Sequence, residues 1–530
     1  MRRRLFLWHR YLGIGLSLLF AFWFVSGVAM LYVRFPILDP EDRFPMLPRF
    51  DPAAFLVSPA EAAARAGVEG HPRRVRLATL LDRPVYYILP VDRPWLGVYA
   101  DDGTVLAPVD TDGAGEVVRQ YMGAGAPRHV ELVETIDQWT LTNSLNLHRP
   151  LHRLALEDEA GTEMYVSEKT GEVVMATTRR ERALAWIGPI VHWIAPEILR
   201  TKVAAWRQTV LWLSVAGTAL AITGLLIGAL RYRRRGYVLK GRAEPHPVRS
   251  PYLGVKLQHH WSGLIFGAVT LTWIASGLLY LNPGGRYQGD LSTETQMTPY
   301  SAGGVRGSMG PRPGQADAMR GGPLDLALWT EPPGAAWARA QRAAAGIRRV
   351  STDGDAVAPK VVELYRFAGR PYYVFFTDAF ESAIVAADDP AEPPVARHPT
   401  EALVAQAQRV VRGDLVSARL IDRYDAYYYS AGYVAAKRLP VLRLDFDDPV
   451  TSLMYVDPHT GAIFRSYDAQ AKVMRWLVMG LHCLDFPFLI LNRPAWDLVI
   501  IGFSAGGLLL STTGLVMGWR RVRPRRRSRA

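Results

Sequence analysis

The sequence predicts a membrane α-helical bundle of four transmembrane helices, built as a parallel internal repeat, with two α+β domains outside the membrane. Four windows that are apolar and nearly free of charge support the bundle, and they cover 11–33, 206–230, 261–281 and 496–519. Each is long enough to cross a bilayer, which takes about 20 apolar residues. Matching motifs in the two halves of the chain support the repeat, and the positions of the basic residues support its orientation.

The 530-residue chain carries a formal net charge of +13, and three short clusters account for this excess. The clusters are Arg2 to Arg4, the loop 231–256 and the tail 520–530, and each flanks an apolar window. Because basic residues collect on the cytoplasmic side, we expect both termini and this loop in the cytoplasm. No basic patch lies within a folded domain, so the charge gives no reason to expect nucleic-acid binding.

These features divide the chain into eight segments. They are helix 1 (1–34), outer domain 1 (35–185), an interfacial segment with helix 2 (186–230), the basic loop (231–256), helix 3 (257–281), outer domain 2 (282–475), an interfacial segment with helix 4 (476–519) and the basic tail (520–530). Within outer domain 2, residues 283–323 are rich in Gly, Pro and Ser, and we expect a flexible insertion there. Strand and hairpin patterns elsewhere predict α+β structure in both domains.

Four histidines occupy matching positions in the two halves. His9 and His259 each have Gly four residues later and a Ser-Gly pair seventeen and eighteen residues later. His192 and His482 each follow a Met-Tyr-Val strand, a Thr-Gly turn and a Trp. Both second helices also end in a Thr-Gly-Leu motif, at 223–225 and 513–515. The two halves therefore read as one unit repeated in the same orientation.

Paired neutral imidazoles in a helix bundle are typical axial ligands of haem iron. We expect His9 and His259 to form an inner pair at the cytoplasmic ends of helices 1 and 3, and His192 and His482 to form an outer pair at the opposite face. The two pairs predict two haem b groups. His260 is predicted to support the inner haem as a second-shell or propionate partner. The single cysteine, Cys483, excludes haem attachment through a CxxCH motif and cysteine-ligated iron–sulfur clusters.

The order of motifs resembles the PepSY-associated transmembrane proteins. The residues that carry the resemblance are Met454 to Gly461, Leu481-His482 and Leu257 to Gly263. The resemblance covers most of the chain outside 283–323 and the tail. It implies a bacterial inner membrane, periplasmic PepSY-like domains and haem-b electron transfer to a ferric siderophore or ferric chelate. The family more often has Leu-His-Arg-x-Leu where this chain has Val191 to Ala195.

The resulting expectation is an oxidoreductase that takes electrons from a cytoplasmic partner or membrane quinol and delivers them to a periplasmic ferric chelate. The alternative is a haem-free membrane-anchored PepSY binding or regulatory module, in which the histidines are interfacial anchors. A transporter is disfavoured because the spans carry almost no charge. His148 and His152 have the spacing of a metal pair on a helix, but Pro150 lies between them and we expect an exposed loop. Copper binding by Met297, Met309 and Met319 is also disfavoured by their irregular spacing.

Overall fold

Four long helices form one bundle in the computed structural model, which describes residues 2–122, 127–141, 143–237, 249–281, 315–343, 357–378, 381–430 and 437–523. The helices are α1 (Arg2–Ala29), α8 (Val203–Arg231), α9 (Val255–Tyr280) and α16 (Ala495–Val522). All four are long and apolar enough to cross a membrane, as the sequence predicted. Helices α1 and α9 begin earlier than their apolar windows, so His9 and His259 lie within helices.

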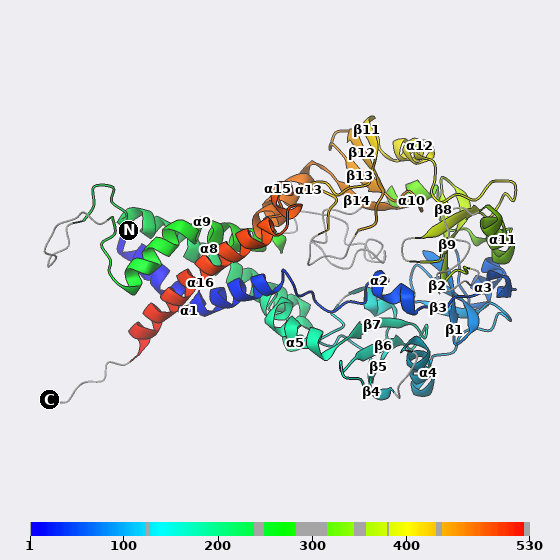
Figure 1. The fold of residues 1–530 in the computed structure, drawn as a ribbon, viewed down its shortest axis with the longest axis horizontal. Helices are drawn as coiled ribbons and strands as arrows, with labels where there is room; N and C mark the ends of the chain where they lie inside the picture. Colours follow the sequence, from blue (N-terminus) through cyan, green and yellow to red (C-terminus); the bar gives the residue numbers. More distant parts are fainter. Residues whose placement is uncertain are drawn as a thin grey trace.

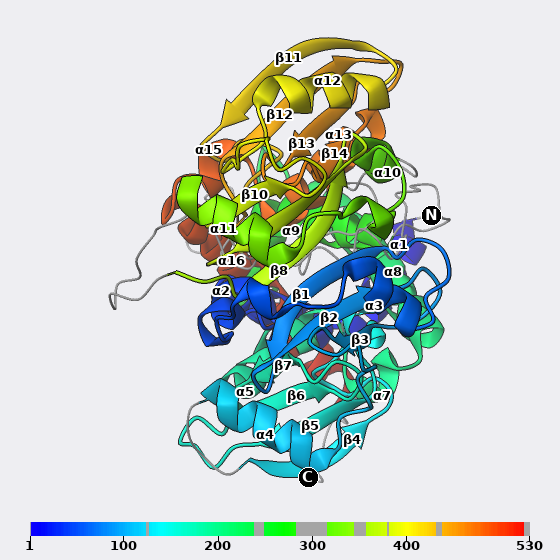
Figure 2. The same cartoon turned by 90° about the vertical axis from the view of Figure 1, so that its right-hand side faces the viewer.

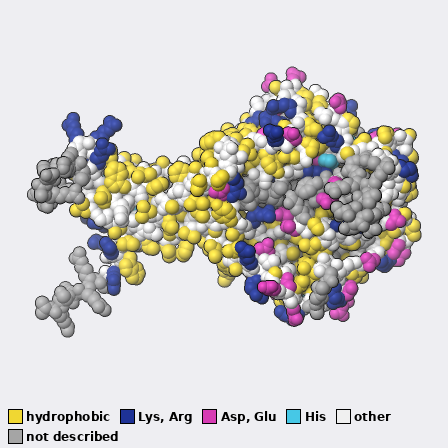
Figure 3. Space-filling model, viewed as in Figure 1, with side chains coloured by type: hydrophobic (Ala, Val, Ile, Leu, Met, Phe, Trp, Pro, Cys, Tyr) yellow, Lys and Arg dark blue, Asp and Glu magenta, His cyan; other side chains and the backbone are white. Residues whose placement is uncertain are grey.

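Each of the four helices in the bundle packs against one helix of its own half and one helix of the other half. Helix α1 packs against α8 and α16, and α9 packs against the same two helices. The start of α1 and the end of α16 lie at the end of the bundle remote from the β-sheets (Figure 1). Apolar side chains cover the bundle surface, and Lys and Arg side chains gather at that same remote end (Figure 3). Residues 238–248 of the basic loop and 524–530 of the tail lie outside the described residues.

A six-stranded antiparallel sheet combines strands from both halves of the chain, in the order β10-β9-β8-β1-β2-β3. Its strands are β1 (Arg74–Leu80), β2 (Arg83–Leu89), β3 (Leu96–Tyr99), β8 (Val361–Phe367), β9 (Arg370–Phe376) and β10 (Ser382–Ala386). The halves join where β1 pairs with β8, with Val75 opposite Leu364. The sheet thus crosses between the segments 35–185 and 282–475. Figure 2 shows the two halves meeting at this pair of strands.

Each half adds a four-stranded antiparallel sheet beside the shared one, in the orders β4-β5-β6-β7 and β11-β12-β13-β14. The first contains β4 (Arg128–Val133), β5 (Leu151–Ala155), β6 (Glu163–Ser167) and β7 (Val173–Thr177). The second contains β11 (Asp414–Ile421), β12 (Val441–Asp447), β13 (Leu453–Val456) and β14 (Ile463–Tyr467). The hairpins predicted from the Met-Tyr-Val motifs form β6–β7 and β13–β14. The antiparallel α+β character of these regions is confirmed.

Short helices cover the sheets and bury their apolar faces. They are α2 (Pro40–Arg43), η1 (Phe44–Met46), η2 (Pro52–Ala54), α3 (Pro59–Arg65), α4 (Thr111–Met122), η3 (Asn143–Leu147), α10 (Gln315–Arg320), η4 (Leu326–Leu328), α11 (Pro333–Ala343) and α12 (Thr400–Val410). Ser58 caps α3 by accepting a hydrogen bond from the Glu61 backbone. Of the insertion predicted over 283–323, residues 283–314 lie outside the described residues, whereas α10 packs its buried Met319 into the core of the second half.

In each half, a series of short helices connects the four-stranded sheet to the bundle. The first half has α5 (Arg179–Ile187), α6 (Pro189–His192) and α7 (Glu197–Arg200). The second half has α13 (Ala469–Met474), the π-helix η5 (Arg475–Gly480), α14 (Leu481–Cys483) and α15 (Pro487–Ile490). A capping box of Thr178 and Glu181 starts α5, and Asp468 caps α13. These connections bring His192 and His482 back to the sheet-side end of the bundle.

Candidate functional site: two pairs of facing histidines

The inner pair consists of one histidine from each half of the chain. His9 on α1 and His259 on α9 face each other with ring centroids 6.3 Å apart and ring planes inclined by 51°. His9 Nδ1 lies 3.3 Å from the Leu220 carbonyl oxygen on α8, and His259 Nδ1 lies 3.2 Å from the Leu510 carbonyl oxygen on α16. Each ring is therefore fixed by the second helix of its own half.

Threonine hydroxyls add a second contact to each inner ring. Thr513 Oγ1 lies 3.0 Å from His259 Nδ1, and Thr223 Oγ1 lies 3.4 Å from His9 Nδ1. Both hydroxyls donate their proton to a backbone carbonyl one turn earlier in their own helix. Each has only lone pairs left for the imidazole, so Nδ1 must carry the hydrogen. Carbonyl oxygens require the same tautomer because they can only accept.

The outer pair repeats this arrangement at the other end of the bundle. His192 of α6 and His482 of α14 have ring centroids 6.0 Å apart and planes inclined by 72°. His192 Nδ1 lies 3.1 Å from Ser26 Oγ on α1, and His482 Nδ1 lies 3.2 Å from Ser276 Oγ on α9. The Trp273 carbonyl also accepts from His482 Nδ1, over 3.0 Å. Here the first helix of each half fixes the ring.

In all four histidines, the hydrogen bonds that involve the ring are made at Nδ1, within the part of the chain that the structure describes. The neutral tautomer with hydrogen on Nδ1 has its lone pair on Nε2. This is the arrangement found where a metal-binding imidazole is oriented by its other nitrogen. In this tautomer, each of the four Nε2 atoms has a lone pair that can bind a metal ion.

A glycine of the neighbouring helix packs against each ring. A Cβ added at Gly224 would lie 2.8 Å from His9 Cε1, and one at Gly514 would lie 3.4 Å from His259 Cε1. At Gly27 and Gly277 the corresponding distances to His192 and His482 are 3.5 and 3.4 Å. The Nδ1–Cε1 edge of every ring therefore rests on a helix surface that has no side chain. These glycines follow directly after the hydroxyl residues at 223, 513, 26 and 276.

The separations within both pairs match those of two imidazoles on opposite sides of one metal ion. Each ligating nitrogen lies about 2.0–2.1 Å from such an ion and about 1.1 Å from its own ring centre, which places the centroids about 6.3 Å apart. The observed distances are 6.3 and 6.0 Å. The inclinations of 51° and 72° also fit, because each ring can rotate about the axis that joins the two ligating nitrogens.

The outer histidines lie in surroundings that favour the neutral ring. Burial, together with the neighbouring His482, lowers the pKa of His192 to about 3. Burial also lowers the pKa of His482 below its ordinary value. Neutral imidazole is the form that binds a metal ion. The lowered pKa values and the hydrogen bonds at Nδ1 therefore both favour neutral imidazole rings in the outer pair.

His260 differs from the four paired histidines because both of its ring nitrogens are bonded within the protein. Nδ1 lies 2.8 Å from Ser250 Oγ, and Nε2 lies 3.0 Å from the Gly228 carbonyl oxygen. The ring is buried and packs edge-on against Tyr252. His260 joins the start of α9 to the end of α8. The predicted role as a second-shell or propionate partner would require it to exchange one of these bonds.

The other sequence candidates occupy the sheets. His148 stacks on Trp95, and the buried His152 bonds to His129 and to the Val109 carbonyl, so the prediction of an exposed loop is wrong for this pair. The contacts with Trp95 and Val109 come from segments distant in the sequence, which the local sequence does not indicate. Tyr428 and Tyr429 are buried, as expected for packing residues. At Gly13 and Gly263, a Cβ would meet only ordinary contacts with leucines at 220 and 510.

The Ser-Gly and Thr-Gly motifs contain the residues that contact the histidine rings, but the sequence does not reveal this role. The Ser-Gly and Thr-Gly pairs were evident as repeat markers, whereas only the packing shows that they contact histidines from other helices. No protein-family model matches the chain, and no curated protein matches it.

Proposed function

We propose that this protein is a haem-b transmembrane electron-transfer protein that reduces a periplasmic acceptor, a ferric siderophore or other ferric chelate. The observation that carries the proposal is the double occurrence of facing histidines at 6.3 and 6.0 Å, with Nδ1 engaged and Nε2 left as a ligand. A porphyrin occupies four positions around iron and leaves two for such a pair. Haem supplies one-electron redox chemistry when bound.

The positions of the two pairs support transfer across the membrane. His9 and Ser26 are separated by 17 residues on α1, which corresponds to about 25 Å at a rise of about 1.5 Å per residue, and Ser26 is the residue that contacts His192. One pair thus lies toward each end of the bundle. His9 and His259 would hold one haem b, and His192 and His482 would hold the other. The apolar helices between them would exclude water and influence the redox potential.

The orientation follows from the charge at the end of the bundle. Basic side chains collect at the end remote from the sheets (Figure 3), and this end includes Arg2 to Arg4, Arg231 to Arg235 and Arg520 to Arg523. Under the positive-inside rule, this end faces the cytoplasm and the sheets face the periplasm of a bacterial inner membrane. Both halves start and finish inside, which makes the repeat parallel, with its twofold axis along the membrane normal.

The acceptor is inferred from the resemblance to PepSY-associated transmembrane proteins and from iron chemistry. The hard oxygen ligands of a chelator hold Fe(III) more strongly than Fe(II). Addition of one electron to the bound Fe(III) would therefore weaken the chelate and release iron. Because no nicotinamide- or flavin-binding motif is present in the sequence, the electron would come from a membrane quinol or a cytoplasmic partner.

Optical spectroscopy of the purified full-length chain tests this proposal. Protein from haem-supplied cells should show a Soret band, α-bands that sharpen on reduction with dithionite, and about two haems b per chain in a pyridine haemochrome assay. Reduced protein mixed with a ferric chelate should be reoxidised as a ferrous-specific dye reports Fe(II). A colourless preparation from such cells would instead favour the haem-free PepSY binding or regulatory module.

A further inference from the structure

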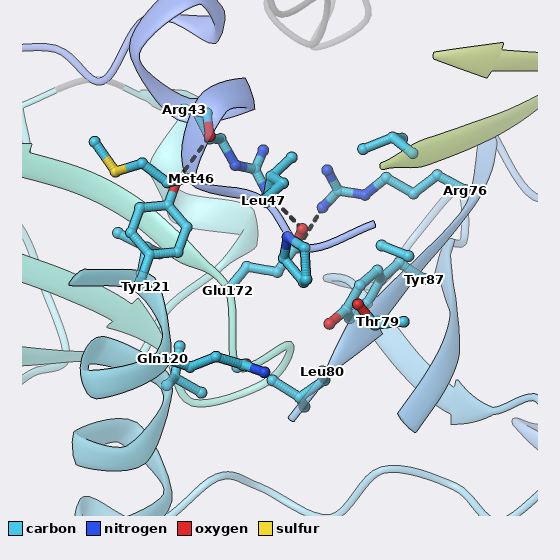
Figure 4. A pocket seen from close by; sticks show the side chains of 16 residues that line it. Arg43, Met46, Leu47, Arg76, Thr79, Leu80, Tyr87, Gln120, Tyr121 and Glu172 are labelled. Carbon is cyan, nitrogen blue, oxygen red and sulfur yellow. Dashed lines mark hydrogen bonds and ion pairs between the residues drawn. The ribbon is translucent and has the colours of Figure 1, made fainter. Parts of the chain in front are cut away.

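A cavity of about 160 Å³ lies in the first half of the sheet region, away from both histidine pairs. The segment α2–η1, strand β1, helix α4 and the turn before β7 enclose it, and Val361 of β8 closes one side. Its polar lining includes Arg43, Arg76, Thr79 and Glu172 (Figure 4). The space suffices for a small ion with water, and it is well below the range of about 300–1,000 Å³ that is typical for larger organic ligands.

The cavity wall contains more positive than negative charge. Glu172 bridges two arginines: its Oε1 accepts from Arg43 Nη2 over 2.6 Å, and its Oε2 accepts from Arg76 Nη2. Figure 4 shows the arginines approaching this carboxylate from opposite sides. Arg74, the nearest further cation on β1, is paired with Glu363. Arg76 is only 8% exposed, so this excess positive charge is withdrawn from water.

Two buried guanidinium nitrogens on the wall have no hydrogen-bond partner among the described residues. They are Arg43 Nε and Arg76 Nε. Buried donors without a partner are rare in folded proteins, and several in one cavity usually indicate a bound ion or ordered water. Because the Nη2 atoms are engaged by Glu172, each arginine still has its Nε–H to offer. A guanidinium favours oxyanions, which accept several such bonds together.

The matching place in the second half shows that the fold does not require these charges. Leu80 packs on Gly171 in the first half, and Phe367 packs on Gly461 in the second. Ala462 follows Gly461, whereas Glu172 follows Gly171. The second half fills this region with Tyr365, whose hydroxyl lies 2.6 Å from His398 Nε2 and donates to a backbone carbonyl. The charged cavity is therefore a local feature of the first half.

We propose that the cavity binds one small oxyanion, a phosphate or a short carboxylate, through Arg43 Nε and Arg76 Nε. The bound anion neutralises the excess positive charge and satisfies both unpartnered donors. It also joins the segment that follows α1 to strand β1 of the shared sheet. The cavity is too small for a ferric siderophore, so this site is separate from the proposed electron acceptor and does not depend on haem.

Thermal unfolding of the full-length protein in detergent tests the site, with sodium phosphate, sodium succinate and sodium chloride compared at equal ionic strength. Saturable stabilisation by phosphate but not succinate identifies the phosphate class, and the reverse identifies the carboxylate class. We expect Arg43→Lys and Arg76→Lys each to weaken binding by about tenfold, the effect of one lost charge-assisted hydrogen bond. Arg83→Lys is the matched control, since Arg83 binds Asp101 and the exposed Asp102, away from the cavity.

Glu172→Gln separates anion binding from a purely structural cluster. Removal of this negative charge should lower the melting temperature of the anion-free protein, because it breaks both ion pairs, and should tighten anion binding, because the cavity becomes more positive. A cluster with only a structural role would show the first effect without the second. The proposal is overturned if neither phosphate nor succinate stabilises the wild-type protein beyond chloride, or if Arg43→Lys and Arg76→Lys bind the anion as the wild type does.

Discussion

His9 on α1 and His259 on α9 face each other at 6.3 Å, although 250 residues separate them in the chain. Neither ring is held by its own helix: α8 fixes the first and α16 fixes the second. All four helices of the bundle therefore contribute to one site. Such a site can form only when both halves have assembled, and this dependence makes its ligands testable as pairs.

We predict that His9→Ala and His259→Ala each remove the same haem. Because one iron would be shared by the two rings, loss of either ligand should lower the haemochrome ratio from about two to about one and remove the same set of α-bands. His192→Ala and His482→Ala should remove the other set. Low-temperature optical spectra of the reduced proteins distinguish the two sets. If the His9 and His259 variants lose different bands, the pairing is wrong.

His482→Ala also separates electron entry from electron delivery. Loss of this ring should abolish reduction of an added ferric chelate at the periplasmic face, while the bands of the inner haem and their reduction by a quinol persist. Proteoliposomes with the chelate and a ferrous-specific dye on one side provide the measurement. Wild-type rates of ferric reduction in the variant, despite loss of the outer haem, would show that the outer pair is not part of the path.

Gly224→Ala should displace its histidine ring more than a methyl group added at any of the other three ring-facing glycines. Its Cβ would lie 2.8 Å from His9 Cε1, whereas the ring contacts at Gly27, Gly277 and Gly514 are 3.4–3.5 Å, and the close contact at Gly514 is with Ser17 Oγ at 2.9 Å. We expect weaker retention of the inner haem, with the outer haem unchanged. Gly15→Ala is the control, because a Cβ there meets nothing within 4 Å. Haem content after gel filtration measures the difference.

The sequence was sufficient for the local features of this fold. Apolar length located all four helices of the bundle, and strand patterns located the Met-Tyr-Val hairpins. It did not predict that β1 and β8 pair, because nothing in two apolar strands separated by some 280 residues specifies their partners. The charged cavity was missed for the same reason: Arg43, Arg76 and Glu172 come from three separate segments and carry no shared motif.

The four paired histidines show the same difference between local pattern and tertiary contact. Their aligned positions could be predicted from the repeat, whereas the hydroxyl and the glycine that contact each ring became evident only from helix packing. His148 and His152 were interpreted from their spacing and the intervening Pro150. Tertiary packing buries His152 and stacks the partly buried His148 on Trp95, in a place where the local sequence resembles a loop. Periodicity and spacing report on neighbours along one element, but contacts between elements depend on the whole fold.

Thr513→Val should raise the midpoint potential of the inner haem. Thr513 Oγ1 accepts from His259 Nδ1–H, which would make the imidazole a stronger electron donor to the proposed haem iron and would stabilise Fe(III). Without this acceptor, Fe(II) would be favoured and the potential should rise by a few tens of millivolts, since the Leu510 carbonyl still accepts. Thr512→Val is the control because Thr512 bonds only to carbonyls of its own helix. A potentiometric titration that shows equal potentials in both variants would contradict this role.

The sheet region should lose stability as the pH falls from 6.5 to 4, in part through His398. Burial lowers the pKa of this side chain to about 4 from its ordinary 6.5, while the nearby Asp457 raises it and His459 lowers it. The unfolded chain takes up a proton before the folded one does, so the stabilisation from the neutral ring is complete above pH 6.5 and declines toward pH 4. Its loss amounts to about 3 kcal/mol at most.

His398→Gln removes this dependence together with the contacts of the ring to Tyr365 and Phe367. We therefore expect the variant to melt below the wild type at pH 7 and the gap between their melting temperatures to narrow as the pH falls to 4. Circular dichroism of both proteins in detergent provides the measurement. His71→Gln is the matched control, because it replaces a histidine with the same residue at an exposed position. A gap between His398→Gln and wild type that stays constant over this range would show that His398 does not remain neutral in the folded protein.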